Sequence, residues 1–172
     1  MTDDVKINRG LKGIYFERSG VSHIDGRAGE LLYRGYTIHD LAEHSTFEEV
    51  CYLLIHGELP GAAELDAFDA ALRAARHLPA AVHEIIRATA DGHPMDVLRT
   101  AVSALAALEP DSRETGAEAF LRNGIRLTAQ VPMIIAAHEA IRNGRDPVAP
   151  DPALIAANPV GKIPALVRPY GP

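Results

Sequence analysis

The sequence of 172 residues lacks tryptophan, has only 5% aromatic residues and contains a single cysteine, Cys51. One cysteine excludes an intrachain disulfide framework and is typical of a reducing compartment, which predicts a cytoplasmic location. Basic residues are also few, because 17 Lys and Arg stand against 23 Asp and Glu, for a net charge of −6. A nucleic-acid-binding surface needs a basic patch, so this balance argues against a nucleic-acid partner.

Long hydrophobic runs are missing as well, since no apolar stretch approaches the roughly 20 residues that a membrane-spanning helix needs. The acidic N-terminus, with Asp3 and Asp4, also lacks the apolar core of a signal peptide. We therefore expect no membrane partner. The abundant residue is alanine, with 28 copies, and alanine is the strongest helix former. The composition favours a protein of closely packed helices.

Residues 1–36 form a segment in which six glycines separate short apolar pieces. Residues 14–16 and 21–24 are predicted strands joined at Ser19-Gly20, and residues 30–33 are a third candidate. The segment is therefore predicted to hold a small N-terminal β-hairpin.

Residues 37–144 follow the helical period and predict a mainly α portion. Capping boxes are expected at Thr37 with Asp40 and at Ser45 with Glu48. Further helices are expected over about 62–76, 79–90, 94–108 and 113–143. In the last of them, Asn123-Gly124 predicts an interruption, and Pro132 predicts a kink because it removes a backbone hydrogen bond.

Four of the expected helices carry apolar residues at helical spacing, which we interpret as their buried faces. These residues are Phe47, Val50, Cys51 and Leu54; Leu65, Phe68 and Leu72; Val82, Ile85, Ile86 and Ala90; and Leu98, Ala101, Val102 and Leu105.

Beyond the helices, residues 145–152 hold three prolines in eight positions and are predicted to be a linker. Residues 153–172 contain four further prolines and one short apolar run. Because so little apolar surface cannot bury a core of its own, we expect this tail to be loosely attached.

Taken one by one, few residues of the sequence point to a catalytic or metal-binding role. The eight histidines include the pairs His39 with His44 and His77 with His83, but none has the spacing that places two imidazoles on one helix face. We interpret them as solvated or singly hydrogen-bonded side chains, Cys51 as a core residue, and Glu48-Glu49 as a solvated helix face. Nucleophile-elbow, dinucleotide-binding and phosphate-binding motifs are absent from the sequence. No catalytic or metal-binding residue is predicted, and the cofactor-binding residues stay unknown.

Several strings in order nevertheless resemble the start of the citrate synthase and 2-methylcitrate synthase family. The most specific are Tyr33-Arg34-Gly35-Tyr36 and Gly57-Glu58-Leu59-Pro60, which occur in tandem. Residues 10–13, 21–26, 47–56 and 93–105 and the helix with Pro132 add to the match. The resemblance covers about residues 10–150 and implies an N-terminal portion of such a protein, with a multi-helical fold.

The resemblance implies the condensation of acetyl-CoA or propionyl-CoA with oxaloacetate, giving citrate or 2-methylcitrate. In the family, an Asp removes a proton and two His residues stabilise the enol and assist at the oxaloacetate carbonyl, which is general acid–base and electrostatic catalysis. Those groups lie in Gly-His-x-x-Tyr and Asp-Phe-Tyr strings that this sequence lacks. No catalytic residue is therefore carried over. The resemblance implies no cofactor beyond the acyl-CoA substrate, and the chain alone is expected to be inactive.

Family members are helical dimers, so the resemblance also implies a homo-oligomer through helices 94–108 and 113–142. Leu98, Val102, Leu105 and Ile134 or Ile135 are expected near the contact. Two alternatives to a synthase portion stay open at this point. One is a non-catalytic helical module that dimerises or pairs with a full-length synthase. The other is a glutathione-binding remnant, because residues 156–166 resemble a segment of glutathione S-transferases and suggest that residues 153–172 are a non-family tail.

Overall fold

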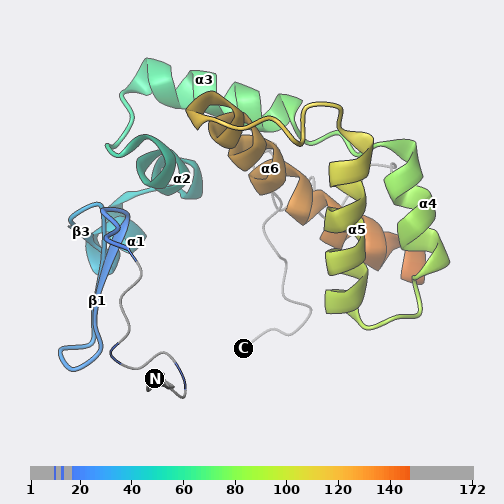
Figure 1. Ribbon diagram of the computed structural model, residues 1–172, viewed down its shortest axis with the longest axis horizontal. Helices are drawn as coiled ribbons and strands as arrows, with labels where there is room; N and C mark the ends of the chain where they lie inside the picture. The colour runs from blue at the N-terminus through green and yellow to red at the C-terminus, as the bar shows by residue number, and fades with distance from the viewer. Residues whose placement is uncertain (1–9, 11–12, 14–16, 148–172) are drawn as a thin grey trace, which may run out of the picture. The chain divides into compact units, whose positions relative to one another are not determined.

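The computed structural model describes residues 10, 13 and 17–147, which form one small sheet and six helices (Figure 1). The chain divides into two compact units, residues 1–46 and residues 47–172. Within the described residues, the mainly α fold class with a small antiparallel sheet is confirmed. The predicted strand at 14–16, the linker beyond residue 147 and the tail at 153–172 lie outside them.

The first unit contains β1 (Ser22–Asp25), β2 (Glu30–Tyr33) and β3 (Tyr36–Thr37) in the antiparallel order β1-β2-β3. The Asp25 carboxylate closes the β1–β2 turn by accepting hydrogen bonds from the backbone N–H groups of Arg27 and Ala28 at 2.8 and 3.0 Å. Arg34 and Gly35, with φ of 50° and 93°, form the β2–β3 turn. Positive φ at both positions is the signature of the type I′ hairpin turn.

Helix α1 (Ile38–His44) follows the sheet directly and packs against β2 and β3, so the first unit extends to residue 46. Thr37 is its N-cap, and its hydroxyl oxygen accepts from the backbone N–H of Asp40 at 3.1 Å. The predicted cap at Thr37 is therefore confirmed. The Asp40 carboxylate completes the turn by accepting from the Thr37 hydroxyl at 2.7 Å.

The second unit is built from five helices within the described residues. They are α2 (Phe47–His56), α3 (Ala62–Ala74), α4 (Ala80–Ala88), α5 (Pro94–Leu108) and α6 (Ala117–Arg142). Helix α6 continues through Gly124, so the interruption predicted at Asn123-Gly124 is wrong. It also continues on both sides of Pro132, where the kink stays a prediction.

Helix α6 joins the two apolar cores of this unit (Figure 1). Its C-terminal half packs with α4 and α5 around Val82, Ile86, Val97, Ala101, Leu105, Ile134 and Ala137. Its N-terminal half contributes Ala129 and Ile125 to a smaller cluster with Phe68 and Leu72 of α3. The predicted buried faces are confirmed for α3 at Phe68 and Leu72, for α4 at Val82 and Ile86, and for α5 at Ala101 and Leu105. Val97 of α5, which was not predicted, is buried as well, at 1% exposure.

The face predicted for α2 is wrong in part. Phe47 is 54% exposed, and the fully buried residue is Leu53, which lies outside the predicted set. Residues 50–55 are all apolar, so the helical period does not single out one face there. Packing against the rest of the protein buries the side of α2 that carries Leu53. Cys51 packs against the cluster that contains Phe68 and Leu72 of α3.

Among the described helices, none is both long enough and apolar enough to cross a membrane.

Candidate functional site

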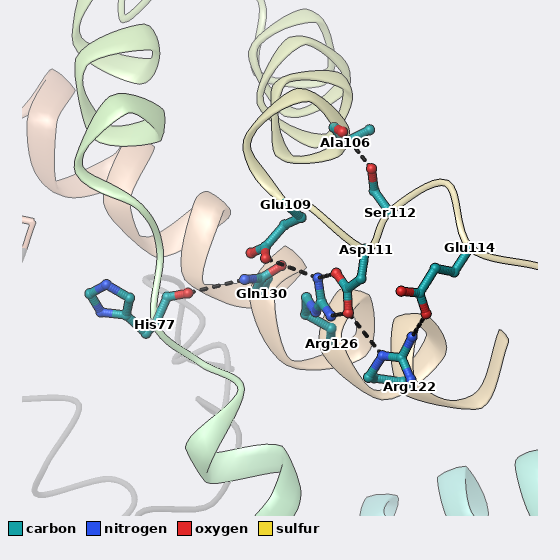
Figure 2. A network of polar contacts seen from close by, with 9 residues as sticks. All are labelled: His77, Ala106, Glu109, Asp111, Ser112, Glu114, Arg122, Arg126 and Gln130. Atoms are coloured by element: carbon teal, nitrogen blue, oxygen red, sulfur yellow. Dashed lines mark hydrogen bonds and ion pairs between the residues drawn. The ribbon is translucent and has the colours of Figure 1, made fainter. Parts of the chain in front are cut away.

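A network of two arginines and three carboxylates fastens the α5–α6 loop to the first turns of α6 (Figure 2). Arg126 donates from both terminal nitrogens to the two oxygens of Asp111 at 2.9 and 2.7 Å, and it reaches Glu109 at 3.0 Å. Arg122 donates to Asp111 at 2.9 Å and to Glu114 at 2.6 Å. Bidentate pairing of this kind is among the strongest of polar contacts.

The two arginines of this network offset most of the negative charge of its three carboxylates. Hydrogen bonds from Arg126 hold the pKa of the Asp111 carboxyl well below its ordinary value, and the same contact raises the pKa of Arg126. Asp111 is therefore ionised at neutral pH and unsuited to act as a general base, which needs a pKa near the working pH. The loop is also held at its other end, where the Ser112 hydroxyl donates to the Ala106 carbonyl at 2.6 Å. We interpret the network as a structural clamp.

Two polar side chains are buried in α6 and connect it to the loops before α4 and α5. Gln130, 2% exposed, donates from Nε2 to the carbonyl of His77 at 3.0 Å (Figure 2). His138, 6% exposed, contacts the carbonyl of Ala90 through Nε2 at 2.9 Å. Buried polar groups of this kind need hydrogen-bond partners, and both side chains find theirs in the carbonyl of a residue between two helices. Their role is to position helices.

His44 and His93 each make one short-range hydrogen bond, whereas His56 contacts aromatic rings. His44 Nδ1 lies 3.1 Å from the Asp40 carbonyl, and His93 caps α5 by accepting from the N–H of Met95 at 3.2 Å. His56 stacks on Tyr52 with ring centroids 4.1 Å apart, and Phe68 meets both rings edge-on. No cluster of three potential metal ligands occurs in the part of the chain that the structure describes.

Cys51 and Glu48 share one side of α2. Burial, with a smaller effect of the Glu48 charge, raises the pKa of Cys51 to about 11, so the thiol is protonated at neutral pH. This position agrees with a core residue. Glu48 is 4% exposed, so its prediction as a solvated residue is wrong. Its charge acts on Arg73 and Arg76 of the neighbouring α3 segment, which provides the electrostatic compensation that a buried carboxylate needs.

The residues expected at an oligomer contact fall into two groups. Leu105 is 3% exposed and belongs to the core between α4, α5 and α6, so its prediction as a contact residue is wrong. Ile134, 1% exposed, belongs to the same core, so of the expected alternatives Ile134 and Ile135 it is not the one at the surface. Leu98 and Val102 are half-buried against that same core. Ile135, 42% exposed, is the expected residue that stays accessible. The helical period gave these residues one face, but it could not separate packing inside the chain from packing between chains.

Exposed apolar residues of α6 define a second feature, which we call the α6 stripe: Phe120, Leu127 and Ile135, at 70%, 41% and 42% exposure. Their spacing of seven and eight residues keeps them on one side of the helix. The sequence carried a signal for this stripe, because residues 131–135 are more apolar than one buried face requires. Large apolar side chains exposed together mark interaction surfaces.

A groove of about 530 Å³ lies between α3 and α6, and we call it the α3–α6 groove. It is lined by Ala71, Ala74, Ala75, Glu118, Leu121, Arg122, Ile125 and Arg126. Its α3 wall consists of alanines, and its α6 wall combines two aliphatic side chains with the arginines of the clamp. Sequence reasoning missed the groove, because its walls come from helices some 50 positions apart.

Comparisons with known proteins agree on one family. A family model described as "Citrate synthase, C-terminal domain" matches residues 10–161. The chain is 44% identical over 151 residues to the citrate synthase of Acidithiobacillus ferridurans. It is 38% identical over 149 residues to 2-methylcitrate synthase 1 of Corynebacterium glutamicum. The crystal structure of citrate synthase from Pyrobaculum aerophilum matches with a TM-score of 0.76 at 35% identity.

These matches cover most of this chain but less than half of each relative. The shares are 84% and 39% for the Acidithiobacillus protein, 86% and 39% for the Corynebacterium protein, and 82% and 38% for the Pyrobaculum structure. The family match runs to residue 161 and so enters the segment 156–166. The comparisons do not support the glutathione S-transferase resemblance of that segment.

Proposed function

The chain belongs to the citrate synthase family, and from this premise we propose that it is the N-terminal portion of a synthase, inactive by itself. The whole enzyme would condense acetyl-CoA or propionyl-CoA with oxaloacetate and release the free thiol of coenzyme A. The observation that carries the proposal is the family match across residues 10–161, together with relatives of which the matched part makes up only about 39%.

The described side chains support an architectural role within that enzyme. The strongest polar contacts, among Asp111, Arg122 and Arg126, are satisfied within the protein and leave no group poised for proton transfer there. Buried Gln130 and His138 hold loops to α6. In this proposal the segment supplies a rigid helical framework, and the acid–base groups come from the remainder of the enzyme. No cofactor beyond the acyl-CoA substrate is invoked.

Self-association through α5 and α6 is the second part of the proposal. The α6 stripe supports it, because Phe120, Leu127 and Ile135 present apolar surface that no described residue covers. The same stripe would also suit pairing with a full-length synthase. It is equally the observation that favours the second candidate, a non-catalytic interaction module. The single, half-buried Cys51 suits a reducing cytoplasm.

The test is an assay of the purified chain for oxaloacetate-dependent thiol release from acetyl-CoA and from propionyl-CoA. We expect no release above a mock preparation, since loss of even one acid–base group typically removes a factor of about 10² to 10⁴ in rate. A full-length relative, such as the Acidithiobacillus synthase, is the positive control. Release that depends on both oxaloacetate and this chain would refute inactivity and assign catalytic groups to these residues.

A further inference from the structure

Helix α4 carries a histidine, His83, that neither the clamp nor the buried contacts of α6 use. Its Nδ1 atom is buried and has no hydrogen-bond partner among the residues that the structure describes. The side chain as a whole is half-buried. Most buried polar atoms of folded proteins are paired, so an unpaired ring nitrogen needs an explanation. A histidine gains a proton, and with it a second N–H donor, close to neutral pH, which offers one.

The C-terminal half of α6 runs beside α4 and in the same direction (Figure 1). Gln130 donates to the carbonyl of His77, which lies before α4. Two turns later, His138 contacts the carbonyl of Ala90, which lies shortly after α4. Near the end of α6, Ile141 packs against the core that α4 helps to form. The last turns of α6 are therefore fixed against α4.

The chain turns sharply where α6 ends. Gly144, with φ of 68°, donates from its backbone N–H to the carbonyl of Ile141 at 2.9 Å. The N–H of Arg145 donates to the carbonyl of Ala140 at 2.8 Å. Together these bonds form a Schellman motif, which ends a helix through a residue of positive φ. The motif holds the chain so that the charge of the next residue, Asp146, acts on the histidine of α4.

Four charged or titratable groups act on His83, and they come from three parts of the chain. They are Glu84 and Arg87 of α4, His77 of the loop before it, and Asp146 after α6. Glu84 is paired with Arg87 at 2.6 Å. Because Glu84 already has this partner, Asp146 is the carboxylate placed to balance a protonated imidazole.

We propose that His83 and Asp146 form a pH-operated latch where the chain leaves α6. The neutral imidazole offers the carboxylate no positive charge. A protonated imidazole donates from both ring nitrogens, and its bond to a carboxylate is charge-assisted. The latch therefore closes on acidification and fastens residues 143–147 to α4. It acts at the point where α6 continues into the rest of the chain, and it does not depend on the proposed catalytic activity of the whole enzyme.

The pH at which the latch closes follows from the surroundings of the histidine. Burial, and then the positive charges of Arg87 and His77, lower the pKa of His83 from its ordinary value of 6.5. The carboxylates of Asp146 and Glu84 act in the opposite direction. Closure is therefore expected below about pH 6.5, and Asp146 makes protonation of the half-buried ring easier than burial alone would allow.

The test follows the pH titration of the histidine ring protons of the full chain by NMR, with His83→Gln to identify the resonance of His83. Asp146→Asn should lower the pH at the midpoint of that titration by about 0.5 unit or more, because the counter-charge is lost. Asp91→Asn is the matched control, since it removes an exposed carboxylate shortly after α4 that is not among the charges acting on His83. This control should leave the midpoint unchanged.

Hydrogen exchange gives a second readout. After correction for the intrinsic effect of pH, the amides of residues 143–146 should be more protected at about pH 5.5 than at about pH 7.5 in the wild type. His83→Gln and Asp146→Asn should abolish this gain, while Asp91→Asn should retain it. The latch is refuted if the midpoint of His83 is the same in Asp146→Asn as in the wild type, or if protection of these amides does not rise on acidification. A gain that survives in Asp146→Asn would also refute it, since another group would then hold the segment.

Discussion

Asp111 and Arg126 are 15 positions apart and form a two-pronged ion pair, with nitrogen–oxygen distances of 2.9 and 2.7 Å. This contact ties the loop after α5 to the third turn of α6, the helix that contributes to both apolar cores. The loop contains Pro110 and little apolar surface, so the pair, rather than burial, determines its path.

Neutralising Asp111 should therefore loosen the loop. Asp111→Asn keeps the shape of the side chain but removes the charge that Arg126 and Arg122 pair with. We expect a lower midpoint of urea unfolding at pH 7, and faster hydrogen exchange in residues 109–116. Asp66→Asn, a similar change at an exposed position of α3, should leave both measurements unchanged.

The same pair predicts a pH dependence of the free energy of unfolding. Because the folded-state pKa of Asp111 is lowered, its stabilisation is complete above its unfolded pKa of about 3.9 and is lost as the pH falls through the folded value. The stability difference between wild type and Asp111→Asn should therefore shrink on acidification below about pH 4. A difference that stays constant down to pH 2 would contradict the ionised pair.

His83 predicts a second, milder dependence on pH. Burial, with Arg87 and His77 nearby, lowers the pKa of His83 below 6.5, although the carboxylates of Asp146 and Glu84 act in the opposite direction. Below pH 6.5 the unfolded chain takes up a proton that the folded chain resists, so stability should fall as the pH drops from 7.5 to 5. His83→Gln cannot titrate and should lose less stability over that interval, measured by urea unfolding at each pH.

The core around α4, α5 and α6 should be sensitive to loss of volume. Ile86 is 0% exposed and packs between these helices, so Ile86→Ala should lower the free energy of unfolding by about 2–5 kcal/mol. Met95 on α5 is 63% exposed, and Met95→Ala should change stability by less than about 0.5 kcal/mol. Equal effects of the two changes in chemical denaturation would contradict the assignment of this core.

The α6 stripe predicts the oligomeric state. Leu127→Asp places a charge in the stripe at a position that the chain itself leaves 41% exposed, so the fold should persist while self-association weakens. Sedimentation velocity at several concentrations measures this, with Ala81→Asp on the exposed side of α4 as the control. A wild-type chain that stays monomeric at high micromolar concentration would remove the basis for the proposed interface.

Local signals predicted much of the fold. Thr37 with Asp40 gave the start of α1, and the spacing of Phe68 and Leu72 gave the buried face of α3, because caps and amphipathic periods act over a few residues. The helical period did not predict the buried face of α2. Its apolar residues are consecutive there, so their spacing does not indicate that Leu53 is the buried one. Glu48 was missed for a related reason, since its compensating charges come from Arg73 of α3 and from Arg76 just after that helix.

The candidate site depended more on long-range contacts. No spacing rule links Asp111 to Arg126, Gln130 to His77, or Ala74 to Leu121, because each pair meets only after the helices have packed. The family strings around Tyr33–Tyr36 and Gly57–Pro60 indicated the family to which the chain belongs. Which of Leu105 and Ile135 is exposed likewise required the structure.

We propose that this helical framework occupies the place of the corresponding segment in a citrate synthase. The most direct test replaces the aligned segment of the Acidithiobacillus synthase with residues 10–147 of this chain, and assays oxaloacetate-dependent thiol release from acetyl-CoA and propionyl-CoA. We expect the chimera to fold and form product, while the relative with the segment deleted does not. A chimera that is folded and associated like the parent enzyme, yet inactive with both acyl donors, would contradict it.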